Sequence, residues 1–210
     1  MKAFVYSGGE IYPDNITEHP KANDICIAAD SGFANAKSLG DRVDIAVGDF
    51  DSLDGGAKTI PSDVEKVTVP SEKDETDTQL AVNVAIAKGV DDVVIIGGLS
   101  GRLDHTLSNL AILEALFDLG VHAVITDGRN RARYIRSTST LLPRSGYKYL
   151  SLIAADDVVK GVCVDGCKYP LKNKKLTKKY QYAVSNEIVE NCALVSVKRG
   201  GLFIIESRDA

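Results

Sequence analysis

Short apolar segments alternate with polar stretches over the first two thirds of the chain. Six of these segments have the length of β-strands: "KAFVYS", "DICIAAD", "VDIAVGD", "EKVTV", "DDVVIIGG" and "VHAVITD". Strands that are apolar on both faces suit a parallel sheet that helices cover. We therefore predict an α/β fold whose N-terminal part is a doubly wound, mostly parallel six-stranded sheet ending near Asp127.

Two segments between these strands have helical periodicity. The first spans residues 77–88, with Thr76 and Gln79 at the spacing of a capping box and Gly89 as its end. The second spans residues 105–120 and closes on a glycine, as helices commonly do. The stripe predicted for the first helix is Leu80, Val84 and Ala87. The stripe predicted for the second is Leu107, Leu110, either Leu113 or Glu114, and Phe117.

The pattern changes from residue 136 onward, where short β-rich pieces follow one another and no helix fits. These pieces are "YKYLSLIA", "VVKGVCVDG", "YQYAVSN", "ALVSVKRGG" and "LFIIESRD". Closely spaced strands with glycine-bearing turns are typical of a small β-sandwich or roll. We therefore predict an α/β domain over residues 1–137 and a small β-sandwich domain over residues 143–210.

Composition narrows the class of protein. At 210 residues and 44% hydrophobic content, the chain can bury a core of ordinary size. It has no signal-peptide-like start and no apolar run near the roughly 20 residues of a membrane span, so we expect a soluble, cytoplasmic protein. The four cysteines form no CxxC pair, and we expect them to be reduced and to bind no zinc.

The charges divide unevenly along the chain. Residues 1–140 carry 13 Lys and Arg against 22 Asp and Glu, whereas residues 141–210 carry 12 against 7. An acidic first part argues against a nucleic-acid surface, and the basic run "KNKKLTKKY" is typical of a solvated hairpin face. We expect no nucleic-acid partner.

Small and acidic residues follow four of the predicted strands. They are Asp30 and Gly32, then Asp49 and Asp51, then Asp74 and Asp77, and finally Gly98, Arg102 and Asp104. Any one of them is explained by a turn or a helix cap. Together they lie at one sheet edge, where crowded carboxylates need a cation, and Mg²⁺ suits oxygen ligands.

The segment "VVIIGGLSGRLDH" joins a buried strand to a helix through a glycine-rich turn, which allows close approach of a phosphate to backbone N–H groups. Arg102 there fits either a phosphate contact or a solvent-screened surface position. The chain has neither a P-loop nor a Rossmann dinucleotide motif, and no Ser or Cys nucleophile stands out. These features favour metal-assisted phosphoryl chemistry.

The motifs "ADSGFAN", "VGDFDSL", "EKDETDTQLAV", "GGLSGRLDHTLSN", "KYPLKN" and "YAVSNE", in this order, resemble the thiamin pyrophosphokinase (thiamine diphosphokinase) family. The resemblance spans nearly the whole chain. It implies transfer of the pyrophosphoryl group of ATP to thiamine with Mg²⁺, by in-line attack at the β-phosphorus, to give thiamine diphosphate and AMP. It also implies a homodimer whose active sites lie at the subunit interface.

The resemblance assigns roles to individual residues. The implied catalytic residues are Asp49, Asp51, Asp74, Asp77 and Asp104, of which Asp49, Asp51 and Asp77 are implied metal ligands. The implied ATP-side residues are Asp30, Gly32, Asn35, Gly98, Arg102, Asp127 and Asn130. The implied thiamine contacts are Ser185, Asn186 and Phe203. Animal members carry an aromatic residue, often Trp, late in the β domain, and this chain has no Trp. Phe203 is therefore either its substitute or a core residue.

Two other functions fit part of the pattern. A thiamine or nucleotide sensor would keep the site without turnover, and a Mg²⁺-dependent nucleotide pyrophosphohydrolase would release AMP without thiamine.

Overall fold

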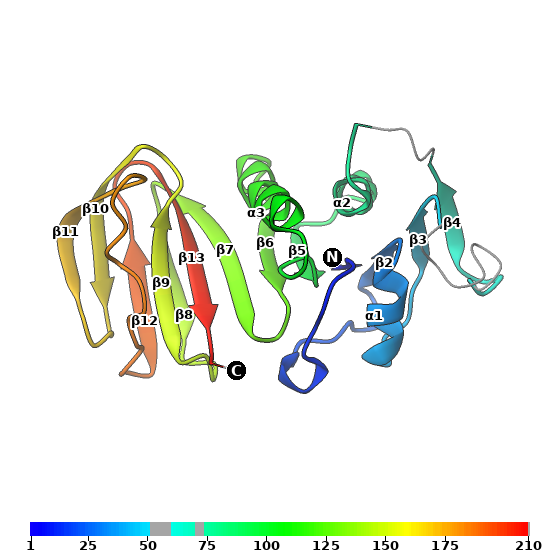
Figure 1. Cartoon of the computed structure of the whole chain (residues 1–210), viewed down its shortest axis with the longest axis horizontal. Helices are drawn as coiled ribbons and strands as arrows, with labels where there is room; N and C mark the ends of the chain where they lie inside the picture. Colours follow the sequence, from blue (N-terminus) through cyan, green and yellow to red (C-terminus); the bar gives the residue numbers. More distant parts are fainter. Residues whose placement is uncertain (51–59, 70–73, 210) are drawn as a thin grey trace. The chain divides into compact units, whose positions relative to one another are not determined.

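The computed structural model describes residues 1–50, 60–69 and 74–209. The chain divides into two compact units, Met1–Gly128 and Arg129–Ala210. The α/β class is confirmed, because the fold combines helices with a mixed sheet and has a separate antiparallel sheet (Figure 1). None of the helices described is both long enough and apolar enough to cross a membrane.

The strands of the first unit pair in parallel. They are β1 (Lys2–Tyr6), β2 (Ile25–Ala29), β3 (Ile45–Gly48), β4 (Glu65–Thr68), β5 (Asp92–Ile96) and β6 (His122–Thr126). Their spatial order is β4-β3-β2-β1-β5-β6. The chain therefore moves outward from β1 and later returns to β5 on the other side of β1. Ligands bind at such a switch point, outside the carboxyl ends of the strands.

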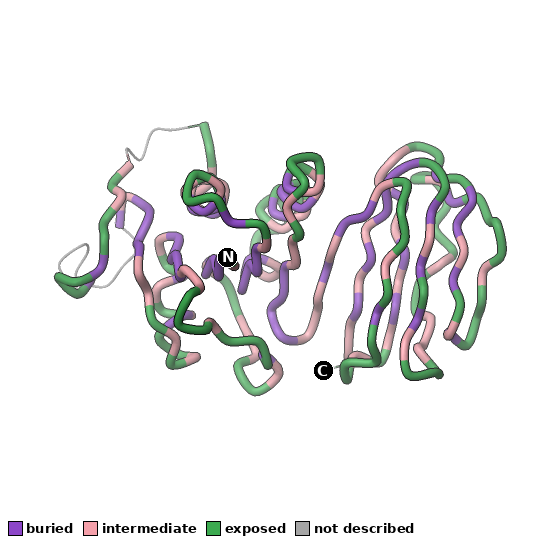
Figure 2. The backbone as a smooth tube through the Cα atoms, turned by 180° about the vertical axis from the view of Figure 1, so that it is seen from behind, coloured by how far each residue is buried: buried purple, intermediate pink, exposed green. Residues whose placement is uncertain are grey.

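Helices cover both faces of this parallel sheet. They are α1 (Gly32–Ser38), α2 (Asp77–Ala87) and α3 (Leu103–Asp118), and a 3₁₀ turn, η1, spans Pro13–Asn15. Figure 1 shows α2 and α3 on one face and α1 on the other. β1, β2 and β5 are buried at all but their first position (Figure 2), which explains why their sequences are continuously apolar.

The helices occur where the periodicity predicts them, but of the residues in the predicted apolar stripes only Leu113 is buried. The buried residues are Thr78, Ala81, Val82 and Ala85 in α2, and Asn109, Ile112, Leu113 and Leu116 in α3. Leu107, a member of the predicted stripe, is 59% exposed. Both helices are apolar on more than one side, so the period alone does not select a face, and small residues bring α2 close to the sheet.

The ends of the helices follow the expected chemistry in most respects. The Thr76 hydroxyl accepts a hydrogen bond from Gln79 N at 3.2 Å, which is half of the predicted capping box. The Gln79 side chain instead donates to Asn83 Oδ1 at 3.0 Å. Gly89 and Gly120 follow the helices with φ of 76° each, a backbone conformation that favours glycine at a helix C′ position.

The second unit consists of antiparallel strands and, in its described residues, has no helix. One set has the order β7 (Asn130–Arg136), β13 (Gly201–Ser207), β9 (Tyr149–Ala154). The other has the order β11 (Leu171–Thr177), β10 (Val158–Asp165), β12 (Cys192–Ser196), β8 (Ser139–Pro143). Both sets contribute to one buried cluster that includes Leu152, Val162, Val195 and Ile204.

Two parts of the second unit differ from the sequence-based expectation. Residues 180–186, predicted as a strand, make only isolated bridges, Thr177 with Tyr180 and Leu150 with Asn186. Strands β7 and β8 lie in segments where the apolar pattern predicted none. All four cysteines are free, as expected, and burial raises the pKa of the Cys26 thiol to about 12.

Candidate active site

A cleft lies in the first unit at the carboxyl ends of β1, β2 and β5. Its position is the switch point of the parallel sheet. The lining residues are Ser7, Gly8, Gly9, Ala29, Asp30, Ser31, Thr76, Asp77, Thr78, Gly98, Ser100, Gly101, Arg102, His105 and Asn109. Of the residues implicated by the sequence, Asp30, Asp77, Gly98 and Arg102 come together here.

The loop after β1 forms one wall of the cleft, and sequence reasoning missed it. The Asn35 Nδ2 group on α1 donates to Ser7 O at 2.8 Å and to Gly9 O at 3.0 Å. Asn35, predicted on the ATP side, therefore holds this loop in place. The glycine pair directly after a buried strand, in "YSGGE", was the available signal.

Gly32 lets α1 begin directly against β1. A Cβ atom at Gly32 would lie 2.0 Å from Tyr6 O and 2.9 Å from Ser7 N. Both atoms belong to the backbone, so the strand itself would have to move.

We expect Gly32→Ala to destabilise the protein by about 1–3 kcal/mol, the usual cost of overpacking. Thermal and urea unfolding measure the effect. Gly40→Ala shows the opposite case, backbone strain without crowding, because Gly40 has φ of 70° and a Cβ atom added there would meet nothing within 4 Å. A Gly32→Ala protein as stable as wild type would contradict the close packing.

The turn after β5 forms the facing wall. Gly97 and Gly98 have φ of 93° and 75°, and Gly98 N donates to Gly8 O at 2.9 Å. The buried Asn109 side chain on α3 donates from Nδ2 to Gly98 O, also at 2.9 Å. A Cβ atom at Gly98 would lie 2.5 Å from that nitrogen, so the turn requires glycine for both conformation and space.

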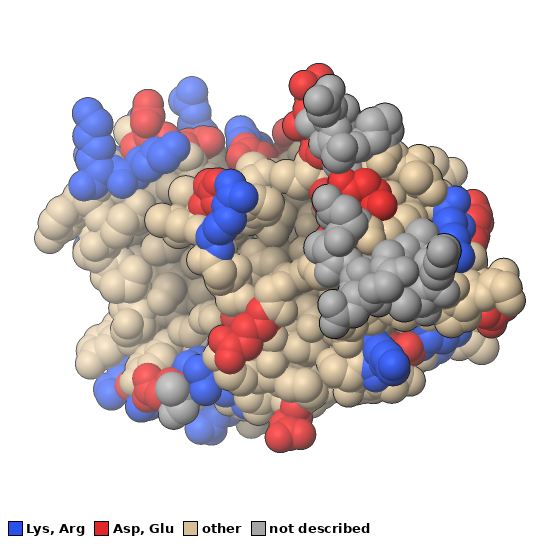
Figure 3. Space-filling view, turned by 45° about the vertical axis from the view of Figure 1, so that its right-hand side comes forward, with Lys and Arg blue, Asp and Glu red and all other residues tan. Residues whose placement is uncertain are grey.

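Charged groups stand at the starts of α2 and α3. Asp77 is the first residue of α2 and lines the cleft. Arg102, before α3, pairs with Asp104 through Nη2 and Oδ2 at 2.6 Å, and this hydrogen bond lowers the pKa of Asp104 to about 2. Both members of the pair are exposed. Figure 3 shows other places on the surface where oppositely charged side chains are neighbours. Arg102 therefore lines the cleft with Asp104 as its carboxylate partner.

The other predicted site residues are placed as follows. Asp49 is half-buried and directly follows β3, and Asp74 is exposed and precedes α2. Asp127 is buried after β6, and Asn130 is the first residue of β7. Asp51 lies outside the described residues. Within the described ranges, no three His, Cys, Asp or Glu side chains group as a metal site. The cleft nevertheless offers the carboxylates of Asp30 and Asp77 beside hydroxyl oxygens, and this donor set fits Mg²⁺.

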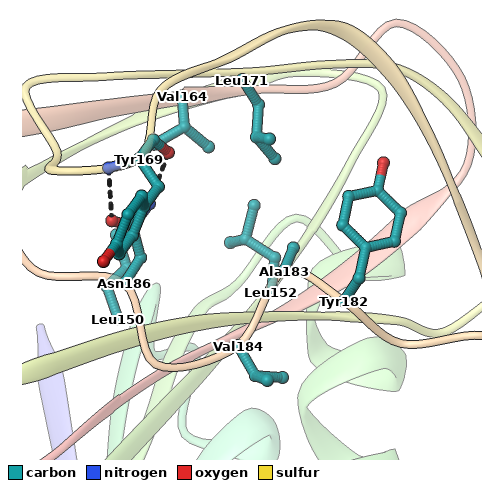
Figure 4. Close-up of a pocket in the computed structure, with 9 residues that line it drawn as sticks. All are labelled: Leu150, Leu152, Val164, Tyr169, Leu171, Tyr182, Ala183, Val184 and Asn186. Carbon is teal, nitrogen blue, oxygen red and sulfur yellow. Dashed lines mark hydrogen bonds between the residues drawn. The ribbon is translucent and has the colours of Figure 1, made fainter.

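A second, apolar pocket lies in the second unit. Leu150, Leu152, Val164, Leu171 and Ala183 form its apolar lining together with Val184, and Tyr169, Tyr182 and Asn186 complete it. Tyr169 and Tyr182 stand on opposite sides of this space (Figure 4). The pocket therefore presents aromatic surface to a ligand without placing a charged side chain in its lining.

Asn186 holds the Tyr169 side of this pocket. Its Oδ1 accepts from Tyr169 N at 2.9 Å, and its Nδ2 donates to Tyr169 O at 2.8 Å (Figure 4). Asn186 therefore lines the pocket while its amide group binds the backbone.

Phe203 lies on the face of the β7-β13-β9 strands that points away from the buried core, and Ser185 contacts a residue of the same face. Because Leu202 and Ile204 are in the buried core, Phe203 between them points to the other face, where it packs against Tyr134 with ring centroids 5.3 Å apart. Ser185 N donates to Ser151 Oγ at 3.0 Å, and Ser151 shares the face of Phe203.

Comparison with family models gives two matches along the chain. A model described as "Thiamin pyrophosphokinase, catalytic domain" matches residues 17–125. A second, described as "Thiamin pyrophosphokinase, vitamin B1 binding domain", matches residues 138–202.

Whole-chain comparisons agree with these matches. A thiamine pyrophosphokinase of Bacillus subtilis (strain 168) is 28% identical over 210 residues, 98% of either chain. Thiamin pyrophosphokinase 1 of Caenorhabditis elegans is 25% identical over 81% of this chain and 72% of its own length. A crystal structure of a thiamin pyrophosphokinase family protein from Enterococcus faecalis is 27% identical and superimposes with a TM-score of 0.84 over the full length of both chains. A crystal structure of thiamine pyrophosphokinase from Bacillus subtilis gives a TM-score of 0.88 over the full length of both chains.

Proposed function

The chain belongs to the thiamin pyrophosphokinase family, and on this basis we propose that it transfers the pyrophosphoryl group of ATP to thiamine, giving thiamine diphosphate and AMP. The observation that carries the proposal is the cleft at the sheet's switch point. Glycine turns and the starts of two helices meet there, an arrangement suited to phosphate groups.

The proposed reaction is in-line attack of the thiamine hydroxyl on the β-phosphorus of ATP. Asp49, Asp51 and Asp77 would hold Mg²⁺, which when bound offsets charge on the phosphate oxygens. Arg102 would pair with a phosphate from the start of α3, and the turn at Gly98 lets the backbone approach it closely. Asp74 and Asp104 would complete the acidic site, while Asp30, Gly32, Asn35, Asp127 and Asn130 would serve the nucleotide side.

The apolar pocket of the second unit is the proposed receptor of the thiamine ring. Thiamine combines flat rings with a cationic thiazolium, and aromatic faces attract such cations. The position of Tyr169 and Tyr182 on opposite sides of the pocket supports this assignment in a chain without Trp. Ser185 and Asn186 belong to the adjoining turn, and Phe203 is the competing candidate on the opposite face of the sheet.

The finer organisation is also part of the proposal. Residues 1–137 would act as a doubly wound α/β domain that binds ATP and Mg²⁺, and residues 143–210 as a β-sandwich that binds thiamine. The matched ranges and the single core shared by the two antiparallel sets of strands support this division. A homodimer with its active site at the subunit interface and a cytoplasmic location stay predictions.

Release of AMP from ATP, with and without thiamine, tests the function. We expect AMP to form in step with thiamine diphosphate and only when thiamine is present. AMP formation that is independent of thiamine would favour the pyrophosphohydrolase. Calorimetric binding of thiamine without AMP release would favour the sensor.

Replacing Tyr182 tests the proposed ring receptor. Tyr182→Leu keeps an apolar side chain but removes the aromatic face, which is worth about 0.5–2 kcal/mol to a bound cation. We expect KM for thiamine to rise about tenfold, with KM for ATP unchanged, in steady-state assays.

Two variants make this result specific. Tyr180→Leu is the matched control, since the Tyr180 ring lies 5.9 Å from that of Tyr182 but does not line the pocket. Phe203→Leu tests the opposite face of the sheet. A larger rise in KM for thiamine with Phe203→Leu than with Tyr182→Leu would move the ring receptor to that face.

A further inference from the structure

Two buried hydroxyl groups meet at the floor of the cleft. Ser7, which follows β1, is 5% exposed, and Thr78, the second residue of α2, is 7% exposed. Their side-chain oxygens are 2.7 Å apart, and both residues line the cleft. The pair therefore joins the central strand of the sheet to the start of a helix inside a candidate ligand site.

The pair has one more hydroxyl proton than it uses. Each hydroxyl carries one proton, and one of the two donates to the other oxygen. Among residues 1–50, 60–69 and 74–209, no second side-chain hydrogen bond is found at either oxygen. One O–H donor is thus left beside the cleft, where a bound group can accept it.

The burial of the Ser7 and Thr78 hydroxyl groups indicates that the pair has a binding role. A buried hydroxyl without a full set of partners costs free energy, and alanine at position 7 and valine at position 78 would fill nearly the same space without that cost. Asn109, the third buried polar residue of the cleft, differs because its Nδ2 already donates to Gly98 O. The hydroxyl pair therefore has an unused O–H donor at the floor of the cleft, and a ligand can accept it.

The start of α2 and the glycine turn favour an anionic oxygen as that ligand. The first N–H groups of a helix have no intrahelical acceptors, and the Thr76 hydroxyl takes only the one from Gln79. Thr78 thus places its side chain and its backbone N–H in the first turn of an eleven-residue helix, where the macrodipole favours negative charge. Gly97 and Gly98, both at positive φ, lie beside Ser7 and present no side chain of their own there.

We propose that the Ser7–Thr78 hydroxyl pair donates a hydrogen bond to a phosphate oxygen of the bound nucleotide and so helps to position the triphosphate. This inference rests on the proposed function and adds two binding residues to which the family resemblance assigned no role. A hydrogen bond to a charged group contributes about 1.5–3 kcal/mol, which corresponds to a change of about 10- to 150-fold in affinity.

Binding of a non-hydrolysable ATP analogue with Mg²⁺, measured by calorimetry, tests the pair directly. We expect Thr78→Val to weaken binding at least tenfold, and Thr78→Ser, which keeps the hydroxyl, to bind within about threefold of wild type. We expect Ser7→Ala to weaken binding similarly, and the double variant to lose less than the two single losses combined, because each disrupts the same pair. In turnover assays KM for ATP should rise while KM for thiamine stays constant.

A structural role would give a different result. If the pair only joins β1 to α2, Thr78→Val will lower the melting temperature while analogue affinity remains at the wild-type value, and the proposal is then wrong. Thr140→Val, on β8 in the second unit and outside the lining of either pocket, controls for the substitution itself. Because analogue binding is measured without turnover, its outcome is separate from a failure of the wild-type protein to make AMP.

Discussion

Asp77→Asn is expected to lower kcat by about a hundredfold or more while leaving the protein folded. Asparagine keeps the shape of the side chain but removes the negative charge at the first residue of α2, on the wall of the cleft. Losing one preorganised electrostatic contact commonly costs about 10²–10³ in kcat. The measurement is AMP release with saturating thiamine and ATP, followed across a range of Mg²⁺ concentrations.

The Mg²⁺ dependence shows whether a slow Asp77→Asn protein is slow because Asp77 is a ligand of Mg²⁺. If Asp77 is a ligand of Mg²⁺, the variant needs more Mg²⁺ to reach its reduced maximum. Glu75→Gln removes the same charge from an exposed position two residues earlier and should keep near-wild-type turnover. Near-wild-type turnover of Asp77→Asn would exclude Asp77 from the metal site.

The strands of the first unit were predictable because their sequences carry the burial pattern directly. Residues of β1, β2 and β5 are buried on both faces, so an uninterrupted apolar run was sufficient. The helix faces were not predictable in the same way. Thr78 and Asn109 are buried because their polar atoms find partners across the fold, and no periodicity in hydrophobicity indicates such contacts.

The candidate site was predictable only in part. Asp30, Asp77, Gly98 and Arg102 follow strands or open helices, and the rule that carboxyl ends of parallel strands share an edge brought them together correctly. The loop of Ser7 to Gly9 forms a wall of the same cleft but carries no charged residue, so the pattern of acidic residues did not predict it. Tyr169 and Tyr182 belong to one pocket through the packing of separate loops, which sequence spacing does not reveal.

The second unit depends on a buried charge that sequence alone did not indicate. Glu206 on β13 is 1% exposed and lies directly opposite Arg131 of β7. Arg131 donates to both of its carboxylate oxygens, from Nε at 2.8 Å and from Nη2 at 2.6 Å. Arg133 Nη2 donates to Oε2 at 3.0 Å, and Ser145 Oγ donates to Oε1 at 3.2 Å.

We expect Glu206→Ala to lower the free energy of unfolding by about 3–5 kcal/mol, because removing one partner of a buried ion pair leaves the other charge uncompensated. Here two guanidinium groups lose the same carboxylate. Burial of Arg133 lowers the pKa of its guanidinium, so its charge depends on the carboxylate of Glu206. Urea unfolding of the variant and the wild-type protein measures the difference.

Comparison with an exposed ion pair tests whether burial causes the loss of stability in Glu206→Ala. Asp209→Ala breaks the exposed pair between Lys148 and Asp209, whose atoms are 2.8 Å apart, and should leave the free energy of unfolding nearly unchanged because solvent screens both charges. Glu206→Gln should fall between the two, since it keeps an acceptor for one guanidinium but not the charge. A loss below about 1 kcal/mol in Glu206→Ala would mean that water reaches the arginines. Because Glu206 lines neither the cleft nor the apolar pocket, the folded fraction of Glu206→Ala should keep wild-type KM values for ATP and thiamine.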